Sequence, residues 1–150
     1  MEGNLPKESV AKLEKRLRHI SGAIKQNGRK ILANYPITSP QFIALQWIID
    51  EEGLTIGELS NRIGLAFSTT TDLVDRMEKN GLVRRIKDEH DRRVVRIQPL
   101  EKGKSIIKEV IDKRREYLGE VLDNFTTEQT EVLNELLTQL YDKMILLNNR

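Results

Sequence analysis

The chain has 150 residues, of which 38% are hydrophobic and 32% are charged, and its formal net charge is +2. This length and composition predict one domain, or a small module with helical extensions. The absence of cysteine excludes disulfides, thiolate metal ligands and thiol redox sensing, and two histidines are too few for a histidine-built metal or catalytic cluster. We therefore expect no metal and no cofactor. No apolar run approaches the roughly 18 residues of a membrane helix, and the first residues lack an apolar signal core, so we expect a cytoplasmic protein with no membrane partner.

The charges are unevenly distributed along the chain. Residues 1–33 carry eight basic and three acidic side chains, and residues 76–96 carry eight basic and four acidic ones. Residues 101–150 carry eight basic and ten acidic side chains. Because binding to phosphates depends on local charge, the near-neutral total does not argue against a nucleic-acid partner.

Two helices are predicted at the start of the chain. The first runs from about Glu8 to Ala33, where apolar residues recur at helical spacing. Ser39 is expected to cap the second helix, with Pro40 in its first turn, and Gly53 to stop it. The buried face of the second helix is expected to be Phe42, Leu45, Ile48 and Ile49.

Two shorter helices follow. Thr55 and Glu58 have the T-x-x-E spacing of a capping box, which predicts a third helix that ends at Gly64. Ser68 is expected to cap a fourth helix, which ends at Gly81. This pair of closely spaced helices is typical of a helix-turn-helix.

The rest of the chain is predicted to form a hairpin and two long helices. The β-rich runs Leu82–Lys87 and Val94–Gln98 flank a six-residue polar segment, which indicates a hairpin. Helical spacing returns past Pro99, and Thr126 with Gln129 forms a second capping box before the last helix.

These elements predict a mainly α protein with a small β-hairpin wing, a winged helix-turn-helix flanked by N- and C-terminal helices. The terminal helices carry more apolar surface than the central module can cover, so we expect them to bury it against a second copy of the chain. The alternative is that they fold back on the central module.

The fourth helix begins with four hydroxyl side chains. A helix-turn-helix places the start of its second helix in the major groove of DNA, where small polar groups can contact bases and phosphates. We therefore predict DNA contacts from Ser68, Thr69, Thr70 and Thr71. Capping explains Ser68 alone but does not explain three threonines, since threonine is a mediocre helix former.

Two cations follow on the same helix. Arg76 and Lys79 are candidate DNA contacts, although a salt bridge with Asp72, four residues earlier, is an equal alternative for Arg76. Asp72 and Asp75 are expected to orient arginine side chains or to face away from DNA.

The polar segment of the hairpin carries the sequence DEHDRR. A wing that enters the minor groove uses arginine, because the narrow groove has a strongly negative potential. Asp91, Arg92 and Arg93 are therefore predicted DNA-contacting residues, with Asp91 holding Arg93 extended. A solvated, charge-balanced turn is the alternative.

The run STTTDLVDRMEKNGLVRR, followed by DEHDRRVVRI and EKG, closely resembles the MarR family of bacterial winged-helix regulators over essentially the whole chain. The resemblance implies a homodimer that binds a pseudo-palindromic, double-stranded DNA operator, usually as a repressor. It implies a single MarR-like domain, with residues 37–100 as the DNA-binding lobe and residues 1–36 and 101–150 as dimerisation helices. It places Ser68, Thr70, Thr71 and Arg76 on the recognition helix and Arg93 on the wing.

Many proteins of this kind release DNA when a small, often aromatic or phenolic, molecule binds. His19, Phe42 and Trp47 are candidates for lining such a site, although an exposed histidine and two core aromatics are the plainer interpretation. The chain has Pro99-Leu100 where the family commonly has Leu-Thr before the EKG turn, which leaves the start of the next helix open.

Two other functions compete with DNA binding as interpretations of the sequence. A winged helix that binds only another protein would fit the near-neutral total charge, but the basic excess near the wing argues against it. An enzyme is not expected, because neither histidine falls near a serine or carboxylate in a recognisable arrangement and there is no glycine-rich phosphate loop.

Overall fold

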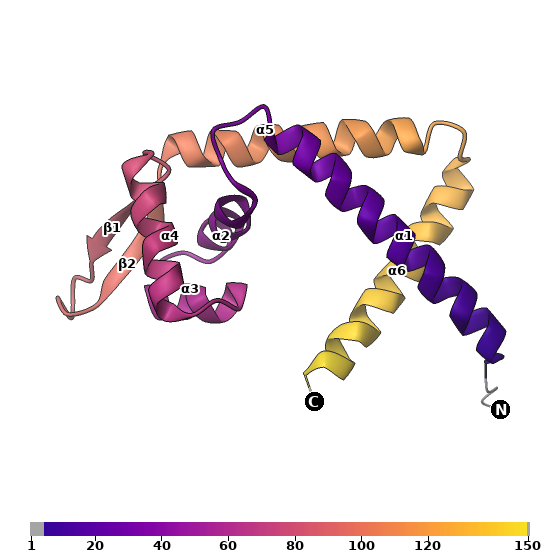
Figure 1. The fold of residues 1–150 in the computed structure, drawn as a ribbon, viewed down its shortest axis with the longest axis horizontal. Helices are drawn as coiled ribbons and strands as arrows, with labels where there is room; N and C mark the ends of the chain where they lie inside the picture. Colours follow the sequence, from indigo (N-terminus) through magenta and orange to yellow (C-terminus); the bar gives the residue numbers. More distant parts are fainter. Residues whose placement is uncertain (1–4, 150) are drawn as a thin grey trace. The chain divides into compact units, whose positions relative to one another are not determined.

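The structure is a computed structural model that describes residues 5–149. It falls into two units, residues 1–113 and 114–150. Figure 1 shows the elements: α1 (Lys7–Leu32), α2 (Ser39–Asp50), α3 (Ile56–Ile63), α4 (Phe67–Lys79), β1 (Val83–Lys87), β2 (Val95–Pro99), α5 (Glu101–Val121) and α6 (Thr127–Asn148). The predicted class, mainly α with one β-hairpin, is confirmed.

The second helix begins one residue earlier than predicted from its cap. Thr38, not Ser39, is the N-cap of α2: its Oγ1 accepts a hydrogen bond from the Gln41 amide at 3.3 Å, and Gln41 Oε1 accepts one from the Thr38 amide at 3.1 Å. Ser39 and Pro40 occupy the first turn, where proline loses no hydrogen bond. The expectation that Ser39 caps the helix is therefore wrong.

The helix-turn-helix consists of α3 and α4. The predicted capping box of α3 is confirmed, with Thr55 and Glu58 exchanging hydrogen bonds of 3.0 and 3.1 Å. Gly64 ends α3 with φ of 70°, a left-handed conformation that costs other residues energy. The N-cap of α4 is Ala66, without a side-chain cap, so the expectation that Ser68 caps this helix is wrong.

The hairpin pairs β1 with β2 in antiparallel register, from Val83 opposite Pro99 to Lys87 opposite Val95. Each strand begins one residue later than the sequence predicted. Leu82 lies in the core, and its amide bonds the Met77 carbonyl at the end of α4. The Ile97 amide also bonds the Leu54 carbonyl at 2.8 Å, so β2 is tied to the segment before α3.

One core supports unit 1. It gathers apolar residues of α2, α3, α4, both strands and the first half of α5, the largest fully buried ones being Leu45, Ile48, Leu59, Met77, Leu82, Ile97, Val74, Val83 and Val110. Burial of this kind is the main stabilising term for the fold. Packing against this core determines which faces of α4 and of the hairpin remain exposed to solvent.

The start of α5 lies at Glu101, directly after Leu100, which settles the point that Pro99-Leu100 left open. The Leu100 carbonyl accepts the Lys104 amide at 3.1 Å, and its own amide bonds the Leu82 carbonyl at 2.9 Å. A Cβ on Gly103 would lie 2.6 Å from the Leu82 carbonyl oxygen. The glycine of the EKG turn is therefore required by this close approach.

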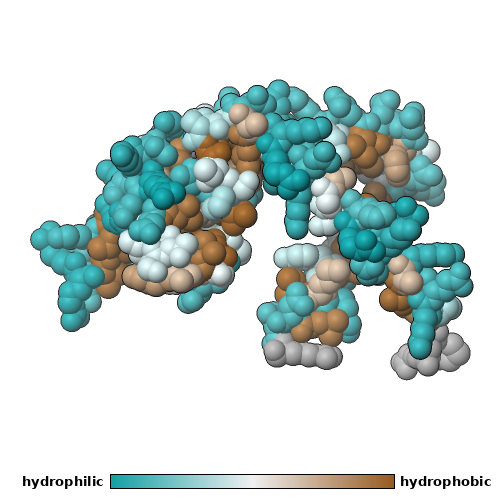
Figure 2. All heavy atoms as spheres, viewed as in Figure 1, coloured by the Kyte–Doolittle hydropathy of each residue, from teal (hydrophilic) through white to brown (hydrophobic). Residues whose placement is uncertain are grey.

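Unit 2 contains the end of α5 and all of α6, which begins with the predicted capping box of Thr126 and Gln129. In the single chain no described residue of α6 is buried. Figure 2 shows hydrophobic side chains of α6 at the surface, and its exposed large apolar residues include Val132, Leu133, Leu136, Leu137, Leu140, Met144 and Leu147. Across residues 5–149, none of the helices is both long and apolar enough to cross a membrane.

Candidate nucleic-acid interface

The start of α4 presents two of the four predicted hydroxyl side chains to solvent. Ser68 and Thr69 are exposed, and Thr71 is half-buried with its hydroxyl donating to the Phe67 carbonyl at 3.0 Å. Thr70 is fully buried, and its hydroxyl donates to the Ala66 carbonyl at 2.9 Å. The prediction that Thr70 contacts DNA is therefore corrected: at this helical position the side chain points into the core, on the same face as Val74.

Arg76 and Lys79 both lie exposed on α4. Within residues 5–149, Arg76 makes no ion pair, so the alternative of a salt bridge with Asp72 is not formed. Its guanidinium therefore stays available to a phosphate or a base edge. Asp75 instead pairs with Arg85 of β1, in keeping with the expectation that this carboxylate orients an arginine.

Arg85 links the recognition helix to the hairpin. Its guanidinium contacts Asp75 at 2.5 Å and Glu78 at 2.7 Å, and its amide donates to Glu78 at 3.0 Å. Burial lowers the pKa of Arg85, but the hydrogen bonds to Asp75 and Glu78 outweigh it and raise the pKa above the ordinary value. This bridge fixes β1 against α4.

The loop between the strands has the predicted Asp91–Arg93 pairing. Arg93 donates from Nε to Asp91 Oδ1 at 3.0 Å and from Nη2 to Oδ2 at 3.1 Å, while its side chain remains 91% exposed. These hydrogen bonds hold the pKa of Asp91 below its usual range. Arg92 is also exposed. The loop thus carries an exposed guanidinium that a carboxylate holds in place before any partner binds.

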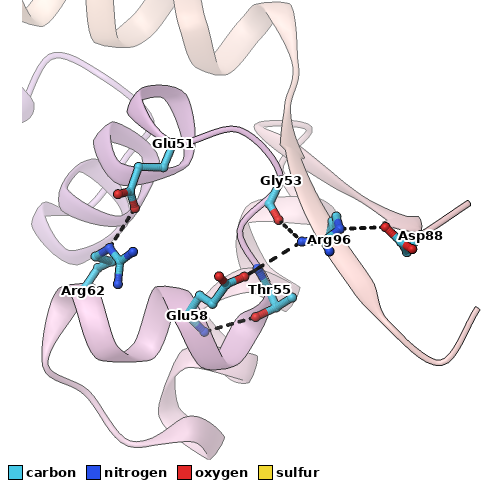
Figure 3. Close-up of polar contacts among 7 residues, drawn as sticks. All are labelled: Glu51, Gly53, Thr55, Glu58, Arg62, Asp88 and Arg96. Carbon is cyan, nitrogen blue, oxygen red and sulfur yellow. Dashed lines mark hydrogen bonds and ion pairs between the residues drawn. The ribbon is translucent and has the colours of Figure 1, made fainter. Parts of the chain in front are cut away.

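A second carboxylate–arginine pair fixes the base of the wing (Figure 3). Asp88 accepts the Arg96 Nε at 2.9 Å, and its other oxygen accepts the amides of His90 and Asp91 at 3.0 and 2.9 Å. The hydrogen bond from Arg96, followed by those two amides, lowers the pKa of Asp88. Arg96 also donates to the Gly53 carbonyl at 2.8 Å. The wing is therefore tied both to its own loop and to the turn after α2.

Sequence reasoning missed the role of Asp88 and left open whether Arg96 faces phosphates or pairs with acids. The only signal was the alternation of acids and bases around the hairpin, which does not reveal that Asp88, the residue after β1, accepts a hydrogen bond from the side chain of Arg96. Arg96 also lies 3.9 Å from Glu58, the carboxylate of the α3 capping box. The wing and the first helix of the helix-turn-helix therefore share one polar network.

The three effector candidates lie in different surroundings. His19 is exposed on α1, Phe42 is 2% exposed inside the core, and Trp47 packs half-buried against it. A hollow of about 370 Å³ lies instead between the end of α2, the hairpin and the start of α5, and none of the three residues lines it. Phe42 therefore packs in the core, as the plainer interpretation of the sequence predicted.

Comparison with known proteins supports the interpretation of this structure as a winged helix-turn-helix. The MarR family model matches residues 37–95. The HTH-type transcriptional regulator YsmB of Bacillus subtilis (strain 168) is 54% identical over 139 residues, covering 93% of this chain and 95% of its own.

Solved structures of MarR-family and related proteins also match this fold. A MarR family protein from Bacillus stearothermophilus is 56% identical, with a TM-score of 0.90 over 95% of this chain and 99% of that one. FabT of Streptococcus pneumoniae, solved in complex with DNA, has the same fold with a TM-score of 0.76 at 20% identity, over 92% of this chain and 99% of its own. The winged helix-turn-helix and these likenesses together show that the chain belongs to the MarR family of DNA-binding transcriptional regulators.

Proposed function

We propose that this MarR-family regulator acts as a homodimeric repressor of a pseudo-palindromic operator, with α4 in the major groove and the β1–β2 wing in the minor groove. The observation that carries the proposal is the wing pair, in which Asp91 holds the exposed guanidinium of Arg93 through two hydrogen bonds. A preorganised cation loses little conformational entropy when it enters a narrow, negative groove.

The surface of α4 supports the same mode of binding. Ser68 and Thr69 lie exposed in its first turn, and Arg76 and Lys79 lie exposed further along. The N-cap Ala66 leaves the first-turn amides without a side-chain partner, whereas α2, α3 and α6 all begin with capping boxes. Amides of this kind bind phosphate well. The proposed DNA-contacting set is Ser68, Thr69, Thr71, Arg76, Lys79, Arg92 and Arg93, with Asp91 as the anchor of Arg93.

The exposed apolar stripe of α6 supports the dimer. Large apolar side chains repeat along the helix at spacings of three and four, and each is at least 37% exposed in the single chain. A contiguous exposed stripe of this length is typical of an interface. The dimer would set two α4 helices roughly one turn of DNA apart, about 34–36 Å.

The remaining features of the proposal follow from family membership. A bacterial operator-binding protein acts in the cytoplasm and needs no enzymatic activity. A small aromatic or phenolic effector that releases the DNA belongs to the proposal; of the three candidate lining residues, His19 and Trp47 remain in contact with solvent.

The experiment is selection of random duplex DNA by the purified protein at near-physiological salt, followed by sequencing. We expect a two-fold symmetric motif with half-sites about one helical turn apart. Sequence-blind, salt-sensitive enrichment would contradict operator binding, and no enrichment at any salt would favour a winged helix that binds another protein.

The dimer is tested separately by light scattering of the eluting protein. We expect twice the chain mass for the native protein and for the control Glu135→Ala, and the single-chain mass for Leu136→Asp, because a charge in an apolar interface is costly. A single-chain mass for the native protein at micromolar concentration would contradict the proposed half-site geometry.

A further inference from the structure

The first residue of α4 is an exposed phenylalanine. Phe67 is 61% exposed, and the two residues that follow it, Ser68 and Thr69, are also exposed. In the view of Figure 1, the start of α4, helix α3 and the tip of the hairpin all lie at the lower edge of unit 1. The phenyl ring therefore lies at the N-terminal end of α4, which is the end that the proposed function places in the major groove.

One side of the ring faces the first turn of α3. Phe67 precedes Thr70 by three residues and Val74 by seven, so it continues the inward face of α4 one turn beyond the end of the core. It also lies beside Gly57 in the first turn of α3, where an added Cβ would meet its Cε2 at 4.0 Å. The ring is thus supported on one side and open on the other.

The chemistry of the major groove selects what this ring can recognise. A phenyl side chain has no hydrogen-bonding group, and among the base edges only thymine offers an apolar group in the groove, its C5 methyl. Single exposed apolar side chains are ordinary on protein surfaces, so exposure alone assigns no role to Phe67. What assigns a role to Phe67 is its position between the exposed hydroxyls of α4 and the first turn of α3.

We propose that Phe67 is a specificity-determining residue that packs on the C5 methyl of a thymine in each operator half-site. The inference rests on the proposed operator binding and deepens it. Ser68 and Thr69 would bond neighbouring base edges or phosphates, and Phe67 would make the site prefer thymine over cytosine and over uracil at one position.

The test replaces each thymine of the selected operator in turn by deoxyuridine, which removes only the C5 methyl. For the native protein we expect one symmetric position at which the exchange weakens binding about fourfold per half-site, the worth of one buried methyl-sized group. Phe67→Ala should bind the thymine and uracil duplexes equally at that position, and Phe67→Leu should restore part of the preference.

Ile43→Ala is the matched control, because it removes an apolar side chain of α2 that is 49% exposed and lies outside the proposed DNA-contacting set. It should leave the thymine preference intact. Loss of the preference in Ile43→Ala, its persistence in Phe67→Ala, or an operator with no methyl-dependent position would overturn the inference.

The failure of operator binding is distinguishable from the failure of this inference. If the native protein selects no specific duplex, the proposed function fails and the inference falls with it. If a symmetric operator is found and Phe67→Ala keeps the methyl dependence, only the role of Phe67 is overturned. Melting temperatures of the variants close to that of the native protein would show that exposed Phe67 is not needed for folding.

Discussion

Arg96 of β2 donates a hydrogen bond from Nη1 to the carbonyl oxygen of Gly53 at 2.8 Å, across a separation of 43 residues. Gly53 has φ of 75°, and a Cβ there would lie 3.3 Å from Arg96 Cδ. The turn after α2 is therefore shaped to receive the arginine. The same guanidinium bonds Asp88, so the direction of the wing depends on the end of α2.

Arg96→Met is predicted to loosen the wing without unfolding unit 1. It removes the hydrogen bonds to Gly53 and Asp88 and keeps an apolar stem against the turn. Amide hydrogen exchange of residues 88–94 should speed up, and operator affinity should fall several-fold. Arg84→Met is the control, since the Arg84 guanidinium donates a hydrogen bond to the Gln98 side chain of the paired strand. Equal exchange in the two variants would contradict a special role for Arg96.

Arg93→Ala is predicted to weaken binding to all duplex sequences. The loss of one cation–phosphate contact should reduce the slope of log affinity against log salt by about one unit. Lys12→Ala, which removes a cation of α1 paired with Glu8, should leave that slope unchanged. The measurement is a salt series by fluorescence anisotropy, and an unchanged slope for Arg93→Ala would remove Arg93 from the interface.

The carboxylates of Asp88 and Asp91 are predicted to titrate below the ordinary value of 3.8. A pKa that is lowered by folding stabilises the native loop fully above the unfolded value, and this contribution is lost as the pH falls through the lowered folded value. The wing should therefore stay ordered at neutral pH and lose order only below about pH 4. Carboxyl chemical shifts followed by NMR give both midpoints, and midpoints at or above 3.8 would contradict the pairing.

Thr70→Val and Thr69→Val are predicted to act on different properties. Thr70 is buried and its hydroxyl only adds a second bond to the Ala66 carbonyl, which already accepts the Thr70 amide at 2.9 Å. Thr70→Val should therefore leave operator affinity unchanged and alter stability by no more than about 1 kcal/mol. Thr69→Val should lower operator affinity and leave stability unchanged. Thermal melts and anisotropy on both variants make the comparison.

Gly103→Ala and Gly119→Ala, both in α5, are predicted to have opposite effects. The new methyl at 103 would lie 2.6 Å from the Leu82 carbonyl oxygen, so we expect a loss of about 1–3 kcal/mol. Position 119 has nothing within 4 Å, and alanine in an open helix position should stabilise by about 0.5–1 kcal/mol. Urea unfolding of both variants tests the pair, and similar effects would contradict the close approach.

The sequence predicted the elements that depend on local rules. The capping boxes at Thr55 and Thr126 and the stop at Gly64 follow from hydrogen bonds within a few residues, and the structure confirms each. The pairing of Asp91 with Arg93 was predicted for the same reason, since the partners are two residues apart. The order of these elements predicted the winged helix-turn-helix, and the family resemblance supported the same prediction.

What the tertiary structure decided is which side chains face inward and which distant groups meet. Four hydroxyls in a row look equivalent in the sequence, but packing of α4 against the core buries Thr70 and leaves Ser68 and Thr69 exposed. Arg96 contacts Gly53 and Asp88 only because β2 packs beside the turn after α2. Local periodicity fixes the elements of this protein, whereas burial and long-range hydrogen bonds, which depend on how those elements pack, select the residues left to face DNA.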